Sequence, residues 1–228
     1  LAICLSQRLP IDFGREANLY IFDKVDTRGF FGNGYGVSKG AAHSFFYNCR
    51  STADIIDGLS NTIAISEGVT ARDYVDPRVK NGMQQSFDIN SWSGTAVACA
   101  AKRSTTDPAL YEVPATNTAT RPRGSGFQFG YPTNFLFNTI LPPNSPSCHR
   151  GTDGMYGGFL SPTSEHSGGA NALRADGSVL FVSDTVDCGV QSSIPSGTPF
   201  ASADFTGQSP FGIWGAMGTI NGGESSTL

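Results

Sequence analysis

Hydrophobic residues occur along this chain in short runs that are separated by Gly, Pro, Asn and Ser. Such runs are typical of β-strands. Apolar positions at helical spacing are almost absent. One helical turn is expected at residues 51–58, where Ser51 and Asp54 have capping-box spacing and Gly58 ends the turn. The pattern therefore predicts a mainly β protein (α+β with very little helix) with long loops. The expected strands are residues 17–25, 62–67, 127–129, 135–141, 170–175 and 178–183.

The chain of 228 residues is expected to form a single β-rich domain, residues 1–228, with a sizeable core. Two stretches rich in Thr, Pro and Ser, residues 103–126 and 192–210, are predicted to be surface loops. The sequence contains nothing close to 18 consecutive apolar residues, so it predicts no membrane span in this chain.

The clearest local pattern is Asp176–Gly177 between two β-compatible runs, which predicts a hairpin with a two-residue type I′ turn. Counting outward from this turn places Ala172 opposite Phe181. The strand after the turn, residues 178–183, is apolar on both sides. We therefore expect it to be a central strand that is covered on both faces.

The same counting places Asp187 opposite His166, at the open end of the hairpin. We therefore expect a structural lock in which Asp187, or nearby Asp184, accepts a hydrogen bond from His166; a bulge at residues 168–169 would shift the pairing by one residue. Direct chemistry between His166 and Asp176 is disfavoured, because ten residues of extended strand separate them by up to about 33 Å.

His166 and Asp176–Gly177, with nine residues between them, resemble the His-x9-Asp-Gly motif of prepilin-like surface proteins found chiefly in planctomycetes, the domain-of-unknown-function family numbered 1559. Four further segments resemble this family and follow its order: residues 53–67, 141–148, 168–171 and 209–224. The resemblance implies export, a pseudopilin-like antiparallel β-sheet domain and, in the precursor, a hydrophobic N-terminal helix that is absent from the chain as given.

Segment 53–67 carries a polar turn that resembles the family's. Its side chains supply oxygen atoms that Ca²⁺ prefers, but the alternating donors of a calcium loop are not present. We favour an Asx turn in which Asn61 binds backbone groups over a Ca²⁺ site near Asp57, and we predict no other cofactor and no metal site. Glu67 is expected to pair with Arg50 or Arg72. The residues of this turn are Asp54, Asp57, Gly58, Ser60, Asn61 and Glu67.

The five cysteines lie far apart, and none has zinc-site spacing. Scarce charge and abundant Gly, Ser, Thr and Asn suit an extracellular protein, in which two disulfides and one thiol are expected. One unpaired cysteine (five choices) and three pairings of the rest leave fifteen arrangements open, from which we choose Cys99 with Cys148. The alternative is a cytosolic domain with buried thiols. The other candidates are Cys4, Cys49 and Cys188.

The charge balance narrows the function classes. Charged residues make up 15% of the chain and the net charge is −4, which excludes a nucleic-acid binder with a basic surface. The sequence contains no Gly-x-Ser-x-Gly, His-Glu-x-x-His or phosphate-loop motif, so we predict that the protein is not an enzyme. His149 follows Cys148 directly and is expected at the surface. Residues 104–120 are rich in Thr and Pro and are candidates for O-linked glycan.

These expectations converge on an extracellular structural protein. We expect a subunit of a surface assembly or filament that contacts copies of itself through the β domain, because an unpaired edge strand offers free N–H and C=O groups to another chain. The terminal segments, residues 1–9 and 213–228, are the candidate contacts. The alternative is a monomeric cell-surface module that binds carbohydrate or protein through exposed aromatic side chains.

Overall fold

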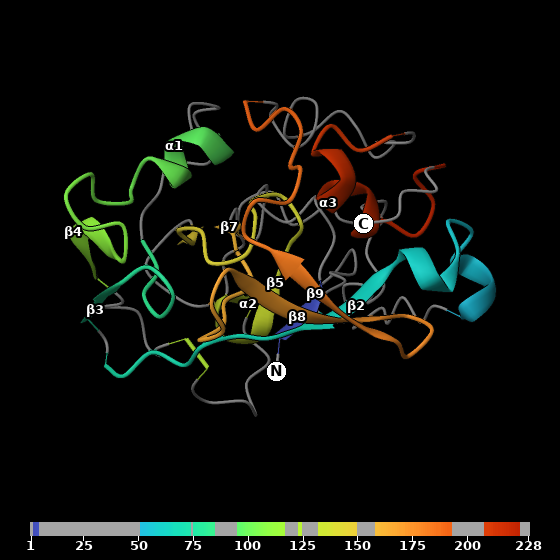
Figure 1. Ribbon diagram of the computed structural model, residues 1–228, viewed down its shortest axis with the longest axis horizontal. Helices are drawn as coiled ribbons and strands as arrows, with labels where there is room; N and C mark the ends of the chain where they lie inside the picture. Colours follow the sequence, from blue (N-terminus) through green and yellow to red (C-terminus); the bar gives the residue numbers. More distant parts are fainter. Residues whose placement is uncertain are drawn as a thin grey trace, which may run out of the picture.

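The computed structural model describes residues 2–4, 51–73, 75–84, 95–116, 123–124, 132–149, 158–192 and 208–223. In this part of the chain the largest sheet has five strands in the order β5-β1-β2-β8-β9 (Figure 1). Neighbouring strands are antiparallel except β1 and β5, which are parallel. The strands are β1 (Ala2–Cys4), β2 (Ile63–Ser66), β5 (Leu136–Phe137), β8 (Gly169–Arg174) and β9 (Val179–Ser183).

Two smaller antiparallel pairs complete the described strands: β3 (Val75–Arg78) with β4 (Leu110–Thr116), and β6 (Cys148–His149) with β7 (Gly158–Phe159). The helices are short: the 3₁₀ turns η3 (Thr52–Asp54) and η4 (Leu59–Asn61), and the α-helices α1 (Ala96–Ala100), α2 (Pro132–Phe135) and α3 (Gly212–Met217). The predicted mainly β class is confirmed. None of the described helices has the length and apolar character needed to cross a membrane.

The strands predicted at residues 62–67, 170–175 and 178–183 are present as β2, β8 and β9. The strand predicted at 135–141 is mostly wrong, because only Leu136–Phe137 is extended and α2 precedes it. The three α-helices were not predicted, since elements of four to six residues are too short to show a helical period. The strands predicted at 17–25 and 127–129 lie outside the described residues.

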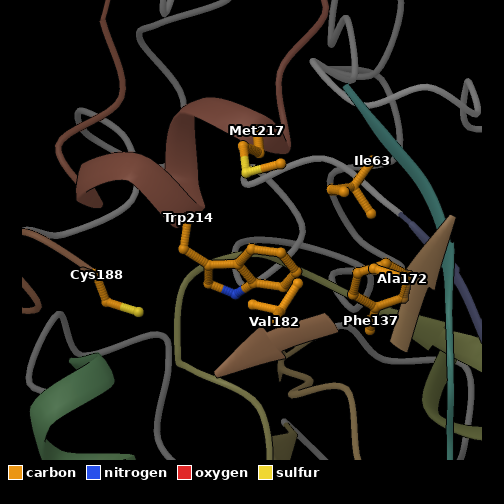
Figure 2. Packing of buried hydrophobic residues seen from close by; sticks show 7 residues of the cluster. All are labelled: Ile63, Phe137, Ala172, Val182, Cys188, Trp214 and Met217. Atoms are coloured by element: carbon orange, nitrogen blue, oxygen red, sulfur yellow. The ribbon is translucent and has the colours of Figure 1, made fainter. Parts of the chain in front are cut away.

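The main core lies between the sheet and α3, where Trp214 and Met217 pack against strand residues (Figure 2). Trp214 is fully buried, lies 6.5 Å from Phe137 between ring centroids, and donates its indole N–H to Leu141 O at 3.0 Å. The sheet contributes alternate positions, as expected for strands with one face on a core. The other members of the cluster are Ile63, Ala172, Val182 and Cys188.

The described parts of the two terminal segments make contacts inside the subunit. Residues 212–217 form α3, which is buried against the sheet. Residues 2–4 form β1, which lies between β2 and β5 in the interior of the sheet. Strand β1 thus completes the sheet through its backbone and α3 completes the core, and contact of the terminal segments with other copies stays a prediction. Residues 5–9 and 224–228 lie outside the described residues.

The β8–β9 hairpin forms where predicted, but its register is shifted by one residue. Ala172 pairs with Leu180, and Phe181 pairs with Asn171. The loop has three residues instead of two, because Arg174 N donates to Ser178 O and Gly177 alone has positive φ, at 88°. Asp-Gly therefore forms a type I-like turn with glycine in the left-handed position, the usual three-residue hairpin loop.

The prediction that this strand is central is wrong: among the described strands, β9 is the last one of the main sheet. Its core face carries buried Val182 and partly buried Leu180. Its other face carries Val179 and Phe181, which are 66% and 50% exposed. A continuous apolar run thus occurs here in a strand with only one buried face. The hydrophobic pattern alone did not distinguish such a strand from one that is buried on both faces.

The stretch predicted as a loop at residues 103–126 contains β4, which pairs with β3, and two buried polar residues, Tyr111 and Arg123. The surface-loop prediction is therefore wrong for this part. In the predicted loop at 192–210 the structure describes only residue 192 and residues 208–210.

The predicted pairing of Cys99 with Cys148 is confirmed, since the two cysteines form a disulfide. It lies in a second buried cluster with Ile140, Leu141 and Phe159. The surface position predicted for His149 is wrong: it is 2% exposed, because β6 pairs with β7 inside the protein.

The remaining cysteines do not form a second disulfide among the described residues. Cys188 is a buried free thiol, and burial, together with the charge of Asp187, raises its pKa to about 12. The backbone of Cys4 lies in β1, opposite Phe137 of β5. Cys49 lies outside the described residues.

Candidate functional site

The family-like residues of segments 53–67 and 166–177 meet at Glu67, at the end of β2. Its Oε1 lies 3.3 Å from His166 Nε2 and accepts the side-chain amide of Asn171 at 3.1 Å. Its Oε2 accepts the backbone N–H of Asn171 at 2.9 Å. The backbone N–H of Glu67 in turn donates a hydrogen bond to Asn171 O. One carboxylate therefore joins β2, β8 and the loop that carries His166.

The electrostatics favour an ionised Glu67. Burial raises the pKa of this carboxyl group. Hydrogen bonds from Ser164 and Asn171 and the attraction of His166 lower the pKa, and together they outweigh burial, so that it lies below the usual 4.5. Ser164 also accepts the backbone N–H of His166 at 3.1 Å. The loop and the carboxylate thus hold each other in place.

The predicted lock between His166 and Asp187 or Asp184 is wrong. His166 pairs with Glu67, whereas Asp187 accepts the backbone N–H groups of Gly189 at 2.9 Å and Ile213 at 3.4 Å. Asp187 therefore sits at the start of α3. The shifted hairpin register, in which Asp184 N donates to Gly168 O, explains why the predicted alignment fails.

Glu67 likewise does not pair with Arg72. The backbone N–H of Arg72 donates to Asp76, at 3.1 Å, and Arg50 lies outside the described residues. The partner that sequence reasoning missed is Asn171. It lies in one of the family-like segments, residues 168–171, so its position was marked, but the contact with Glu67 depends on strand pairing across 104 residues.

Asp176 and Gly177 shape the turn. Asp176 Oδ1 accepts the backbone N–H of Ser178 at 2.8 Å and its hydroxyl at 2.7 Å, and these bonds lower the pKa of Asp176. The backbone N–H of Asp176 donates to Leu59 O. The hairpin tip is thereby attached to η4, so this half of the motif acts on architecture.

The polar turn at residues 54–61 is also held by internal bonds. Ser51 donates its backbone N–H to Asp54 at 2.6 Å, as the capping box predicts. Asn61 donates its side-chain amide to Asp57 O at 2.8 Å, so it binds a backbone group as predicted, but as a donor to a residue four positions earlier and not in the Asx-turn geometry. Gly58 has φ 96°, and Ser60 lies within η4.

Asp57 is 8% exposed, and its carboxylate binds the C-terminal segment. Oδ2 accepts Gly222 N at 2.6 Å and the Thr219 hydroxyl at 3.1 Å, and Oδ1 accepts Gly223 N at 2.9 Å. These donors occupy the oxygen atoms that a Ca²⁺ ion near Asp57 would need. Within the described part of the chain, no group of three or more His, Cys, Asp or Glu side chains is arranged to hold a metal ion.

A further buried polar cluster lies beside the 141–148 segment. The Tyr111 hydroxyl is 3.1 Å from Gly82 O, and Arg123 donates to the Ser147 hydroxyl at 3.2 Å and to Ser161 O at 2.5 Å. Burial raises the pKa of Tyr111 to about 12 and lowers that of Arg123 to about 10. The groups bind backbone oxygens, which is typical of a structural network.

An open groove of about 630 Å³ lies on the sheet face opposite α3. Ile65, Leu173 and Val179 form its apolar part, and Glu67 and His166 form one polar side. When His166 is neutral and donates through Nε2, its Nδ1 is an acceptor. The groove therefore combines an apolar strip with one hydrogen-bonding corner.

The groove ends at β9, whose outer edge has its own chemistry. Arg174 N donates to Ser178 O, and Asp184 N donates to Gly168 O, so residues 178, 180, 182 and 184 face β8. Because hydrogen-bonding direction alternates along an antiparallel pair, the N–H and C=O groups of Val179, Phe181 and Ser183 point away from β8. Ser183 O accepts Val186 N.

Comparison with known proteins gives one family. A family model described as "Protein of unknown function (DUF1559)" matches residues 18–189 of this chain. No curated protein and no solved structure matches the chain. The matched range includes Glu67, Asn171 and the His166–Gly177 motif, so the contacts of Glu67 with His166 and Asn171 lie within the family region.

Proposed function

Because the chain belongs to the DUF1559 family, we propose that it is a structural subunit of an extracellular assembly and that copies associate by strand addition at the outer edge of β9. The observation that carries the proposal is the exposure of Val179 and Phe181 on the last strand of the main sheet. An edge strand offers a row of donors and acceptors to a second chain.

The two edges of the main sheet differ in a way that supports β9 as the contact. The opposite edge, β5, has two residues and follows directly on α2, and very short edge strands are poor templates for pairing. Strand β9 has five residues, Val179–Ser183, and contains neither proline nor a charged side chain. Its own sequence thus lacks proline and charge, two of the features with which soluble proteins protect an edge.

The chemistry of the motif residues supports a structural role over catalysis. The carboxylates of Glu67 and Asp57 accept hydrogen bonds from the protein's own backbone at 2.9 Å and 2.6 Å. A general acid or base needs a proton or lone pair that faces substrate. Here the carboxylate oxygens instead fix segments that are distant in sequence.

The proposed location outside the cell is supported by the Cys99–Cys148 disulfide, because such bonds persist mainly in oxidising compartments. Thr105 and Thr106 are exposed and lie within residues 104–120, where we propose O-linked glycan. An intact mass of the native protein equal to that of the bare chain would contradict glycosylation.

The experiment that tests the assembly is sedimentation velocity of the full chain over a concentration series, with Phe181→Pro and Phe181→Ser as variants. Phe181→Pro removes an N–H that points away from β8, so the β8–β9 ladder keeps its bonds while strand addition loses a donor. We expect the wild type to associate and Phe181→Pro to weaken association by roughly a hundredfold.

Phe181→Ser is the matched control for the aromatic ring. It removes the apolar side chain but keeps the backbone N–H, so association that depends on strand pairing weakens less than in Phe181→Pro. Circular dichroism checks that both variants are folded. A wild type that stays monomeric at every concentration, or two variants with equal association, would contradict strand addition at β9.

The alternative function, a monomeric surface module that binds carbohydrate or protein, is favoured by the groove beside Glu67 and His166. Its apolar strip and its hydrogen-bonding corner are the elements of a ligand site. Binding of a glycan array by the wild type and loss of that binding in Leu173→Asp, with no concentration-dependent association, would support the module and reject the assembly.

A further inference from the structure

The dipeptide Asn221–Gly222 follows α3 and lies beside Asp57. Asn221 is exposed, whereas Gly222 is buried. Asparagine is a chemically labile residue. A following glycine increases this lability, because it has no Cβ to hinder attack of its backbone nitrogen on the asparagine side chain. The sequence and the exposure of Asn221 are therefore those of a deamidation site.

The fold holds the attacking nitrogen in a hydrogen bond. Gly222 N donates to Asp57 Oδ2 at 2.6 Å, and Gly223 N donates to Oδ1 at 2.9 Å. The Thr219 hydroxyl donates to Oδ2 from the other side of the dipeptide, at 3.1 Å. The Asp57 carboxylate therefore binds this segment on both sides of Asn221, through the Thr219 side chain before it and the backbone of Gly222 and Gly223 after it.

We propose that Asn221 is a site of spontaneous deamidation and that Asp57 restrains this reaction in the folded protein. In the reaction, Gly222 N loses its proton to water and forms a bond to Cγ of Asn221, while the Cγ–Nδ2 bond breaks and the leaving nitrogen takes one proton from water to depart as ammonia. Water then opens the cyclic imide to aspartate or isoaspartate. The imide nitrogen carries no hydrogen, so the ring forms only after Gly222 N–H has left Asp57.

The modification has a defined structural consequence. Isoaspartate places an additional carbon in the main chain between residues 221 and 222, which displaces Gly222 N–H from Asp57. The new carboxylate also adds a negative charge next to the segment that Asp57 binds, which weakens that contact. Deamidation therefore loosens the attachment of residues 219–223 to the turn at Asp57.

The dipeptide Asn81–Gly82 is an internal comparison with the same chemistry in a different setting. Asn81 is 3% exposed, and its side-chain amide donates to Thr70 O at 2.8 Å. Gly82 N donates to Arg78 O at 2.7 Å. Both reacting groups are held, so this site is expected to stay unmodified in the native protein.

The test follows deamidation of the full chain by peptide mapping and mass spectrometry at mildly alkaline pH. In the native protein we expect Asn221 to react at least roughly tenfold more slowly than in the same chain unfolded in guanidinium, because a hydrogen bond to a carboxylate must first break. Equal rates in the two states would overturn the proposal, whether or not any variant folds.

Two variants then assign the restraint. Asp57→Asn keeps the side-chain shape but has only one oxygen acceptor, and we expect it to raise the native rate at Asn221 roughly tenfold while Asn81 is unchanged. Thr219→Val is the matched control, because it removes a different donor to Asp57 and leaves both backbone bonds. A folded Asp57→Asn protein with the wild-type rate would show that Asp57 is not the restraint.

Discussion

Strands β9 and β3 both lie at the edge of a sheet, yet their sequences treat that edge differently. In β3 the residues after Val75 are Asp76, Pro77 and Arg78, and the Arg78 backbone N–H is already bound by Asp76 Oδ1 at 3.1 Å. The ladder with β4 also shifts register there. Charge, proline and a bulge are three recognised protections of an edge.

Strand β9 has none of these protections, although it is equally peripheral in the described sheet. The difference shows that position at an edge does not by itself make a contact surface. What distinguishes β9 is that no carboxylate among the described residues binds its outward donors and that Val179 and Phe181 on its outer face are apolar and exposed. Among the described strands, β3 therefore carries protections that β9 lacks.

The largest expected effect tests whether β9 really has two different faces. Val182→Asp places a carboxylate against Trp214 in the core and should lower the free energy of unfolding by about 3 kcal/mol or more. Val179→Asp, on the exposed face, should change it by about 0.5 kcal/mol or less. Urea unfolding of both variants measures the contrast, and equal losses would place both side chains in the core.

A smaller effect is expected when β9 is given the protection that β3 has. Val179→Lys should weaken self-association by roughly tenfold, about 1.4 kcal/mol, without loss of monomer stability, because a lysine on an edge opposes pairing. Val113→Lys on β4 is the control, since Val113 is 67% exposed and Val179 is 66% exposed. Sedimentation of the two variants compares them, and equal weakening by both would argue against β9 as the specific contact.

The smallest effect concerns Glu67, which attaches β8 to β2 beneath the groove. Its folded pKa is lowered from 4.5, so its stabilising contribution is fully present above that value and is lost as the pH falls through the folded pKa. Glu67→Gln should lower neutral-pH stability by about 1 kcal/mol and should make unfolding less dependent on pH below 4.5. Urea midpoints measured across the acidic pH range give both values. Identical pH profiles for the wild type and Glu67→Gln would show that Glu67 does not contribute to the pH dependence of stability.

The sequence predicted the parts of the fold whose determinants are local. The capping box at Ser51 and Asp54, the hairpin at Asp176–Gly177 and the strand before Glu67 were all located from neighbouring residues. The Cys99–Cys148 pair was chosen correctly, although spacing alone did not decide among the possible cysteine pairs. The turn type was wrong, because three-residue and two-residue loops share the same Asp-Gly sequence.

The candidate site was predicted less completely, because its contacts join residues distant in sequence. His166 was expected to contact an aspartate across the hairpin. Instead it contacts Glu67, which lies 99 positions earlier in the sequence (166 − 67). Asn171 and Gly222 were missed as partners of Glu67 and Asp57 for the same reason. A shift of one residue in register was enough to move Asp187 out of reach of His166.

The amino-acid sequence by itself determined that this protein is rich in β-strands, where its main hairpin turns and which family motif it carries, since these depend on neighbouring residues and on spacing. Only the tertiary structure decided which face of β9 is buried, that β9 is an edge strand and which carboxylate binds His166. The physical reason is that burial and pairing are set by the order of strands in the sheet, and that order comes from contacts between segments that the sequence keeps far apart.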